Sequence, residues 1–262
     1  MGQVVSFYSF KGGTGRSTSL SNIAYQLAKE GASVGCMDFD LSAAGLHWIY
    51  DIGPNRVANT KSIHNRLSSE KANSGDMDDY IIDLARSYRD DDIQGELYLM
   101  PGEVDGSVVQ EIKQNAGTMH RKMREIIGDF EARYDLDYLF LDSRSGISSQ
   151  AMPIFDQADI LLTFTRWTHQ HKLGTSELIS WILGTQVELD DVICMASNVP
   201  NSVPESKIAE WVTHELHHDV EKFQVVNESE LLKEKERILT KEKTDSKAAK
   251  QYRKVADVID SI

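Results

Sequence analysis

With 262 residues, 40% of them hydrophobic, the chain is long enough to bury the core of one α/β domain, and we expect a single domain over residues 1–262. The net charge of −13 disfavours nucleic-acid binding by the surface as a whole, because an acidic protein is repelled by phosphates. No apolar run reaches the ~18 residues that span a bilayer and the N-terminus lacks a basic signal-peptide start, so we expect a cytoplasmic protein that does not dock on membranes.

Short apolar runs alternate with amphipathic stretches along most of the chain. The apolar runs predict strands at 4–10, 33–38, 96–100, 137–142, 159–165 and 190–198, with a further short strand at 222–226. The amphipathic stretches predict helices at 17–30, 107–133, 149–156, 170–184, 204–217, 229–239 and 245–262. Strands without a polar face belong to a mostly parallel sheet with helices on both faces, so the predicted fold class is α/β, doubly wound.

Residues 51–92 form the least readable stretch, because they are polar and weakly periodic. We expect mobility or a partner surface there. Cys36 and Cys194 each fall in a predicted buried strand, which favours two core residues over a disulfide or a metal site.

The segment 10–18 is a glycine-rich turn between the first predicted strand and the first predicted helix. At such a junction the backbone N–H groups and the helix dipole converge on an anion. Glycines at positions 12, 13 and 15 let the chain fold closely around phosphates, and the Ser17 hydroxyl is placed to bind Mg²⁺. We therefore interpret the segment as a phosphate-binding loop formed by Lys11, Gly12, Gly13, Thr14, Gly15, Arg16, Ser17 and Thr18.

Two other interpretations of this segment are open. One is an ordinary glycine-rich β-turn. The other is the dinucleotide fingerprint G-x-G-x-x-G, which Gly13 and Gly15 begin, with Asp38 as the ribose-binding acid; Thr18 stands where its third glycine belongs.

The sequence Lys-Gly-Gly-Thr-Gly-Arg-Ser at 11–17 resembles the deviant Walker A motif of the ParA/MinD family of ATPases, in which the early lysine, here Lys11, is the signature residue. The segment 37–41 is similar to the family's D-x-D motif, 138–142 to its Walker B strand, and Asn198 to its adenine-reading Asn. The resemblance implies ATP and Mg²⁺ as ligands, ADP after turnover, and a face-to-face homodimer in which Lys11 reaches the partner's nucleotide.

The chain looks closest to a bacterial subgroup that reads K-G-G-x-G-R, D-x-D-L-E-A-P-G-L and D-S-R-T-G. Arg16 replaces the Walker lysine of the wider family; it keeps the charge but cannot imitate a compact ammonium at a transferring phosphoryl group. Ser42 and Ala44 replace a Glu and a Pro of the subgroup, so a role carried by that Glu does not transfer.

Four side chains follow from these motifs as candidates for the chemistry. Ser17 would bind Mg²⁺, Asp142 would hold that ion through water, Asp40 would orient the attacking water, and Asp38 would support them. An Asp at a strand end also serves as an N-cap for the next helix. Arg144, two residues past Asp142, would contact a γ-phosphate or partner carboxylate, or stay solvated.

The histidines and tryptophans give weaker evidence of a functional role. The spacing H-E-x-H-H at 214–218 lacks the general base of a zinc protease, which favours a surface helix over a zinc site. The histidines considered for such a site are His47, His64, His169, His171, His214, His217 and His218. Trp167, Trp181 and Trp211 lie in or beside predicted helices, where packing is the expected role.

The region 233–254 is basic, with nine Lys or Arg against four acids, a net charge of +5. It forms part of a basic C-terminal helical segment at 233–262 and would serve as a non-specific DNA patch, or alternatively as a solvated helix face with internal ion pairs to Glu234, Glu236 and Glu242. Tyr252, Val255, Ile259 and Ile262 form a thin apolar stripe that we expect to pack against the sheet.

We therefore expect an ATP-dependent, dimerising ATPase that acts as a nucleotide switch in positioning or partitioning a cargo, with an unidentified protein partner. The alternative is a slow or non-hydrolysing nucleotide-gated adaptor that recruits a protein in a signalling or defence system. Because Arg16 stands in for the Walker lysine, binding is better supported than turnover.

Overall fold

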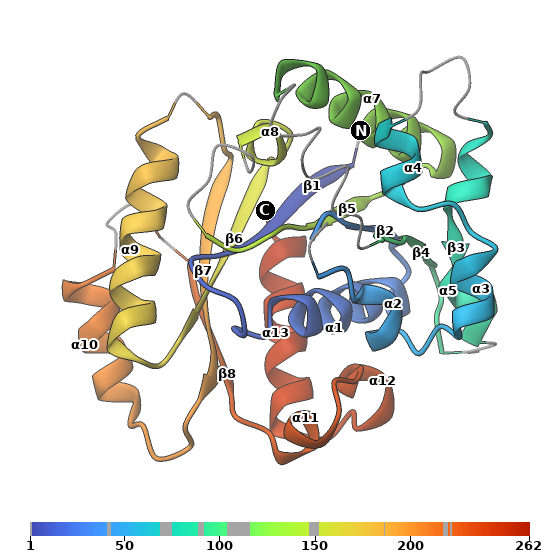
Figure 1. Ribbon diagram of the computed structural model, residues 1–262. Helices are drawn as coiled ribbons and strands as arrows, with labels where there is room; N and C mark the ends of the chain where they lie inside the picture. Colours follow the sequence, from blue (N-terminus) through green and yellow to red (C-terminus); the bar gives the residue numbers. More distant parts are fainter. Residues whose placement is uncertain are drawn as a thin grey trace.

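The computed structural model describes residues 2–40, 43–68, 75–88, 92–103, 116–146, 152–185, 187–216, 220 and 222–262. Within these residues the chain forms one eight-stranded sheet with the order β3-β4-β2-β5-β1-β6-β7-β8 (Figure 1). All neighbouring pairs are parallel except β3 and β4. The strands are β1 Gln3–Ser9, β2 Ser33–Asp38, β3 Ile82–Asp83, β4 Glu96–Met100, β5 Tyr138–Asp142, β6 Ile160–Arg166, β7 Asp191–Val199 and β8 Lys222–Asn227.

Helices cover both faces of the sheet (Figure 1). Successive residues of β1 pack into different apolar clusters, Val5 and Phe7 with helices α1 and α13, and Val4 and Tyr8 on the other side. The helices are α1 Arg16–Lys29, α2 Leu46–Ile49, α3 Pro54–Ala58, α4 Ile63–Ser68, α5 Leu84–Tyr88, α7 Ala116–Tyr134, α8 Met152–Phe155, α9 His169–Leu183, α10 Glu205–His214, α11 Glu230–Glu234, α12 Leu239–Glu242 and α13 Lys247–Asp260, with a 3₁₀ turn η2 Met77–Tyr80. The predicted α/β class is confirmed.

The seven predicted strands all form, each end within one residue of its expected place. The predicted helix at 229–239 forms only over Glu230–Glu234, as α11, and the chain is extended at Lys235. This extension lets Ile238 and Leu239 reach the apolar cluster that contains α1, where both are buried. Two predicted helices lie partly outside the described residues, over 107–115 and 149–151. The helix predicted at 204–217 ends three residues early, because α10 ends at His214.

The stretch 51–92, where we expect mobility or a partner surface, has regular structure over much of its described part. It contains helices α3, α4 and α5, the turn η2 and the edge strand β3, and several of its apolar side chains are buried. Their spacing is irregular because each short element contributes only one or two of them. The buried ones are Ile52, Ile63, Leu67, Met77, Tyr80, Ile82 and Leu84.

The strand order reverses direction at the carboxyl end of β1. β1 lies between β5 and β6, and the chain leaves it through α1 toward β2, on the β5 side. In open parallel sheets, ligands bind outside the carboxyl ends of the strands where the order reverses. None of the described helices is long and apolar enough to cross a membrane.

Candidate functional site

The loop between β1 and α1 has the backbone of an anion site. Gly13 and Gly15 have φ of 73° and 76°, the left-handed region that a side chain disfavours. The first helical hydrogen bond runs from Ser19 N–H to the Gly15 carbonyl, and no described side chain caps the helix. The N–H groups at the start of α1 are therefore free to bind an anion, and the first turn carries no acidic residue to oppose it.

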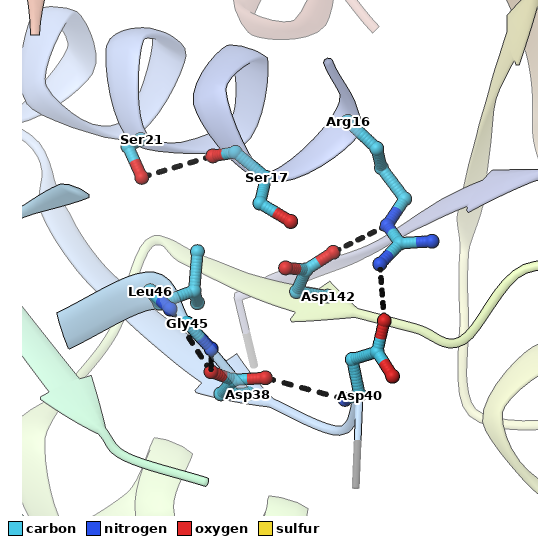
Figure 2. A network of polar contacts seen from close by, with 8 residues as sticks. All are labelled: Arg16, Ser17, Ser21, Asp38, Asp40, Gly45, Leu46 and Asp142. Carbon is cyan, nitrogen blue, oxygen red and sulfur yellow. Dashed lines mark hydrogen bonds and ion pairs between the residues drawn. The ribbon is translucent and has the colours of Figure 1, made fainter. Parts of the chain in front are cut away.

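Arg16 does not point out toward solvent from this loop. Its Nε donates to Oδ1 of Asp142 at 2.5 Å and its Nη2 donates to Oδ2 of Asp40 at 3.1 Å, so one guanidinium bridges two acids (Figure 2). Only 7% of Arg16 is exposed. Burial opposes its charge, but the two carboxylates more than offset this and raise the pKa of Arg16.

Asp142 and Ser17 stand together beneath the loop. Asp142 ends β5 and is 1% exposed, and burial raises the pKa of its carboxyl, while Arg16 and a hydrogen bond from Ser17 act in the opposite direction. A hydroxyl and a carboxylate in contact are the hard oxygen donors that Mg²⁺ prefers. The donor set fits that ion, although one oxygen of Asp142 is already held by Arg16.

Asp38 lies beside Asp142 because the two are register partners on β2 and β5. Its carboxylate holds the following loop, with Oδ1 accepting from Asp40 N–H at 3.2 Å and Oδ2 accepting from the N–H groups of Gly45 and Leu46 at 2.9 and 3.0 Å (Figure 2). Burial and the nearby Asp142 raise the pKa of Asp38 to about 7. In the structure Asp38 is thus an anchor that fixes where Asp40 stands.

The other predicted nucleotide contacts surround the same loop. Asn198, the last but one residue of β7, has a φ of 51°, and its side-chain amide lies 3.6 Å from where a Cβ on Gly15 would stand. The Lys11 ammonium lies 5.8 Å from the ring centre of Phe10 and, among the described residues, has no carboxylate within ion-pair distance. Arg144 is exposed just past Asp142. Thr14 and Thr18 are buried.

Sequence reasoning missed one contact of the loop. Ser197, at the residue before Asn198, is buried and its hydroxyl donates to the carbonyl of Thr14. The signal was present as a Ser-Asn pair at the end of a buried strand, but only the second residue matched a motif.

The expected core roles of the remaining residues are confirmed where described. Cys36 and Cys194 are buried free thiols. Trp211 is buried against Trp167 and Phe223, with ring centres 5.8 and 5.5 Å away. Among the residues that the structure describes, no group of three metal-binding side chains gathers, and His217 and His218 lie outside them.

Comparison with known proteins identifies a matching family model and several solved structures with the same fold. A family model described as an AAA domain matches residues 2–195. Among solved structures, the septum site-determining protein MinD complexed with Mg-ADP from Pyrococcus horikoshii OT3 has a TM-score of 0.75 and 22% identity, over 99% of this chain and 96% of that one. No curated protein matches by sequence.

Two further structures have the same fold. A putative plasmid partition protein from Borrelia burgdorferi B31 bound to AMPPNP is 15% identical with a TM-score of 0.74, over 100% of both chains. A Cyanothece McdA complex with ATP is also 15% identical, with a TM-score of 0.73, over 99% of this chain and 96% of that one. At these identities the likeness concerns the fold.

Proposed function

The chain belongs to the AAA domain family and has the fold of the ParA/MinD-type P-loop ATPases, and from this premise we propose that it is an ATP-dependent, dimerising nucleotide switch that positions a cargo. The observation that carries the proposal is the convergence of Ser17, Asp40 and Asp142 beneath the open N-terminus of α1. A helix start that attracts phosphate, placed above hard oxygen donors, suits a nucleoside triphosphate with Mg²⁺.

Each group has a distinct task in this proposal. The N–H groups of 12–18 would cradle the phosphates, Ser17 and Asp142 would hold Mg²⁺, and the ion would neutralise phosphate charge. Asp40, on the loop fixed by Asp38, would orient the water that attacks the γ-phosphate. Asn198, whose side-chain amide lies beside Gly15 of the loop, would contact the nucleotide's base.

The dimer rests on Lys11. A single subunit already offers phosphates the free N–H groups at the start of α1, and no described carboxylate holds Lys11, so Lys11 is available to a partner's nucleotide. In an isologous dimer each Lys11 would meet the partner's phosphates in a water-poor interface, where a charge pair contributes strongly.

The test is sedimentation of the full chain with ATP and Mg²⁺. We expect the wild type to form dimers, and Lys11→Ala to bind ATP yet remain monomeric at the same concentration. Lys29→Ala is the matched control, because Lys29 ends α1, far from the loop, and its exposed pair with Asp92 contributes little. Lys11→Ala dimers, or a wild type that stays monomeric with ATP bound, would refute the switch and leave a nucleotide-binding domain.

One observation favours a second candidate, a slow nucleotide-gated adaptor. Arg16 is engaged with Asp142 and Asp40, the acids that turnover needs. A guanidinium that stays there during binding would compete with the metal and with water orientation, so that ATP is held and a protein partner reads the dimer. Steady-state turnover with and without DNA separates the two: stimulated hydrolysis supports the positioning switch, and none supports the adaptor.

The DNA role, if the switch is of the partitioning kind, belongs to the basic region 233–254. Some of its cations are already paired, Lys233 with Glu228 and Glu230, and Lys235 with Asp51. Lys247, Lys250 and Lys254 are exposed on α13 and have no ion pair among the described residues. These three lie on one helix, and we propose them as the cations that contact phosphates.

A further inference from the structure

A cavity of about 770 Å³ lies at the amino ends of the central strands, whereas the nucleotide loop lies at their carboxyl ends. Its lining includes Gln3 at the start of β1 and Tyr138 at the start of β5, whereas the loop follows the other end of β1. Nothing in the proposed switch uses this place.

The cavity is strongly acidic. Five carboxylate residues line it and, among the described residues, no Lys or Arg does; the five are Glu30, Glu131, Asp135, Asp137 and Asp260. The cations next to them in sequence are occupied elsewhere, Lys29 by Asp92 at 3.1 Å and Arg133 by Asp78 at 2.6 Å. The negative charge of the cavity is therefore not balanced by a neighbouring side chain of the described chain.

Helix ends add to this potential. α1 ends at Lys29, α7 at Tyr134 and α13 at Asp260, and a cavity-lining acid stands at or directly after each of these ends. The carboxyl end of a helix carries about half a negative charge and favours cations. Three such ends converge on one cavity.

Glu131 is an independent sign of a ligand. Only 7% of it is exposed, and its Oε1 accepts no hydrogen bond from the described residues. Burial and, to a smaller extent, the nearby Asp159 raise the pKa of Glu131. The N-terminal ammonium of the chain lowers this pKa, but by less than burial and Asp159 raise it. A buried acceptor without a donor is costly, and a positively charged N–H donor in the cavity would satisfy it.

We propose that this acidic cavity binds an organic polycation of the polyamine class. The carboxylates do not gather into a metal cluster, since no group of three metal-binding side chains occurs among the described residues. They are spread around a cavity larger than a single ion needs, which suits several ammonium groups on one flexible chain, each meeting a separate carboxylate. Tyr138, whose hydroxyl donates to Oδ1 of Asp260 at 2.6 Å, fixes one of these acids in place.

The test is calorimetric titration of the full chain with spermidine, in the absence of nucleotide and at constant low salt. We expect saturable binding by the wild type and at least tenfold weaker binding by Glu131→Gln. Asp135→Asn is a second variant that keeps the fold, because Asp135 is exposed with φ of 48°, a conformation that Asn tolerates well, and we expect it to weaken binding several-fold. Glu188→Gln, an exposed acid outside the cavity, should leave the affinity unchanged.

Three outcomes would overturn the proposal: no saturable heat with spermidine, equal displacement of spermidine by MgCl₂ and by NaCl at matched ionic strength, or equal losses in Glu131→Gln and Glu188→Gln. Thermal melting of each variant shows whether it is folded. Lys11→Ala should bind spermidine as the wild type does, so failure of the nucleotide switch and failure of the cavity are separate results.

Discussion

Asn22 in α1 and Thr240 in α12 are joined by hydrogen bonds although 218 positions separate them. The Thr240 N–H donates to Oδ1 of Asn22 at 3.1 Å, and the Thr240 hydroxyl donates to the Asn22 carbonyl at 3.0 Å. The Asn22 amide also donates to the carbonyl of Arg237 at 3.1 Å. The helix that follows the nucleotide loop is thereby fastened to the basic C-terminal segment.

Asn22→Ala should therefore destabilise the protein. We expect a loss of about 2–4 kcal/mol, because a buried polar group left unpaired costs ~1–3 kcal/mol and the Thr240 N–H and the Arg237 carbonyl would both be left so. Urea unfolding followed by circular dichroism measures it. Asn55→Ala, at an exposed position of α3, should change stability by less than about 0.5 kcal/mol. Equal effects of the two substitutions would mean that the bridge contributes nothing.

Arg16→Lys tests the bridge between Asp142 and Asp40. A lysine keeps one charge but lacks the planar fork that reaches both acids, so we expect the unliganded protein to lose about 1–3 kcal/mol of stability. With Asp142 released, ATP affinity should depend more on Mg²⁺ than in the wild type, and turnover should rise. Calorimetry with and without Mg²⁺ measures the first effect. Identical Mg²⁺ dependence in both proteins would show that Arg16 does not compete for the ion's ligands.

Asp40→Asn tests the proposed role of Asp40 in the chemical step. Asp40 is expected to orient water only during hydrolysis, so ATP binding should stay within about threefold while turnover falls at least a hundredfold. Phosphate release and equilibrium binding are measured on the same preparation. Asp245→Asn, at an exposed position before α13, is the control and should leave both unchanged. Undiminished turnover in Asp40→Asn would remove this residue from the mechanism.

Replacement of Lys247, Lys250 and Lys254 by Ala tests DNA binding. Each lysine that neutralises a phosphate contributes about one unit to the slope of log affinity against log salt, so the triple variant should lose up to ~3 units of slope. The matched control replaces Lys233 and Lys235, which are already paired with acids, and should change the slope less. DNA binding with no salt dependence, or with equal losses in both variants, would contradict this assignment.

The sequence indicated the sheet well because buried parallel strands are continuous apolar runs, which are hard to mistake. It indicated the nucleotide loop because glycines at 12, 13 and 15 leave few alternatives. It did not indicate that Arg16 turns toward Asp142 and Asp40, since that contact joins residues 126 and 24 positions apart. The acidic cavity was equally invisible, because its carboxylates come from three helix ends and a loop that only the fold brings together.

The family match ends at residue 195, but the core does not. Tyr252, Val255 and Ile259 of α13 are buried in the same cluster as Leu20 and Ile23 of α1. A chain cut at the end of the match would lack α13, which packs on α1, and the apolar side chains of α1 would be exposed to solvent. We expect such a fragment to aggregate. The role of the C-terminal segment is therefore best studied by changing charges on its outer face, with its inner face left intact.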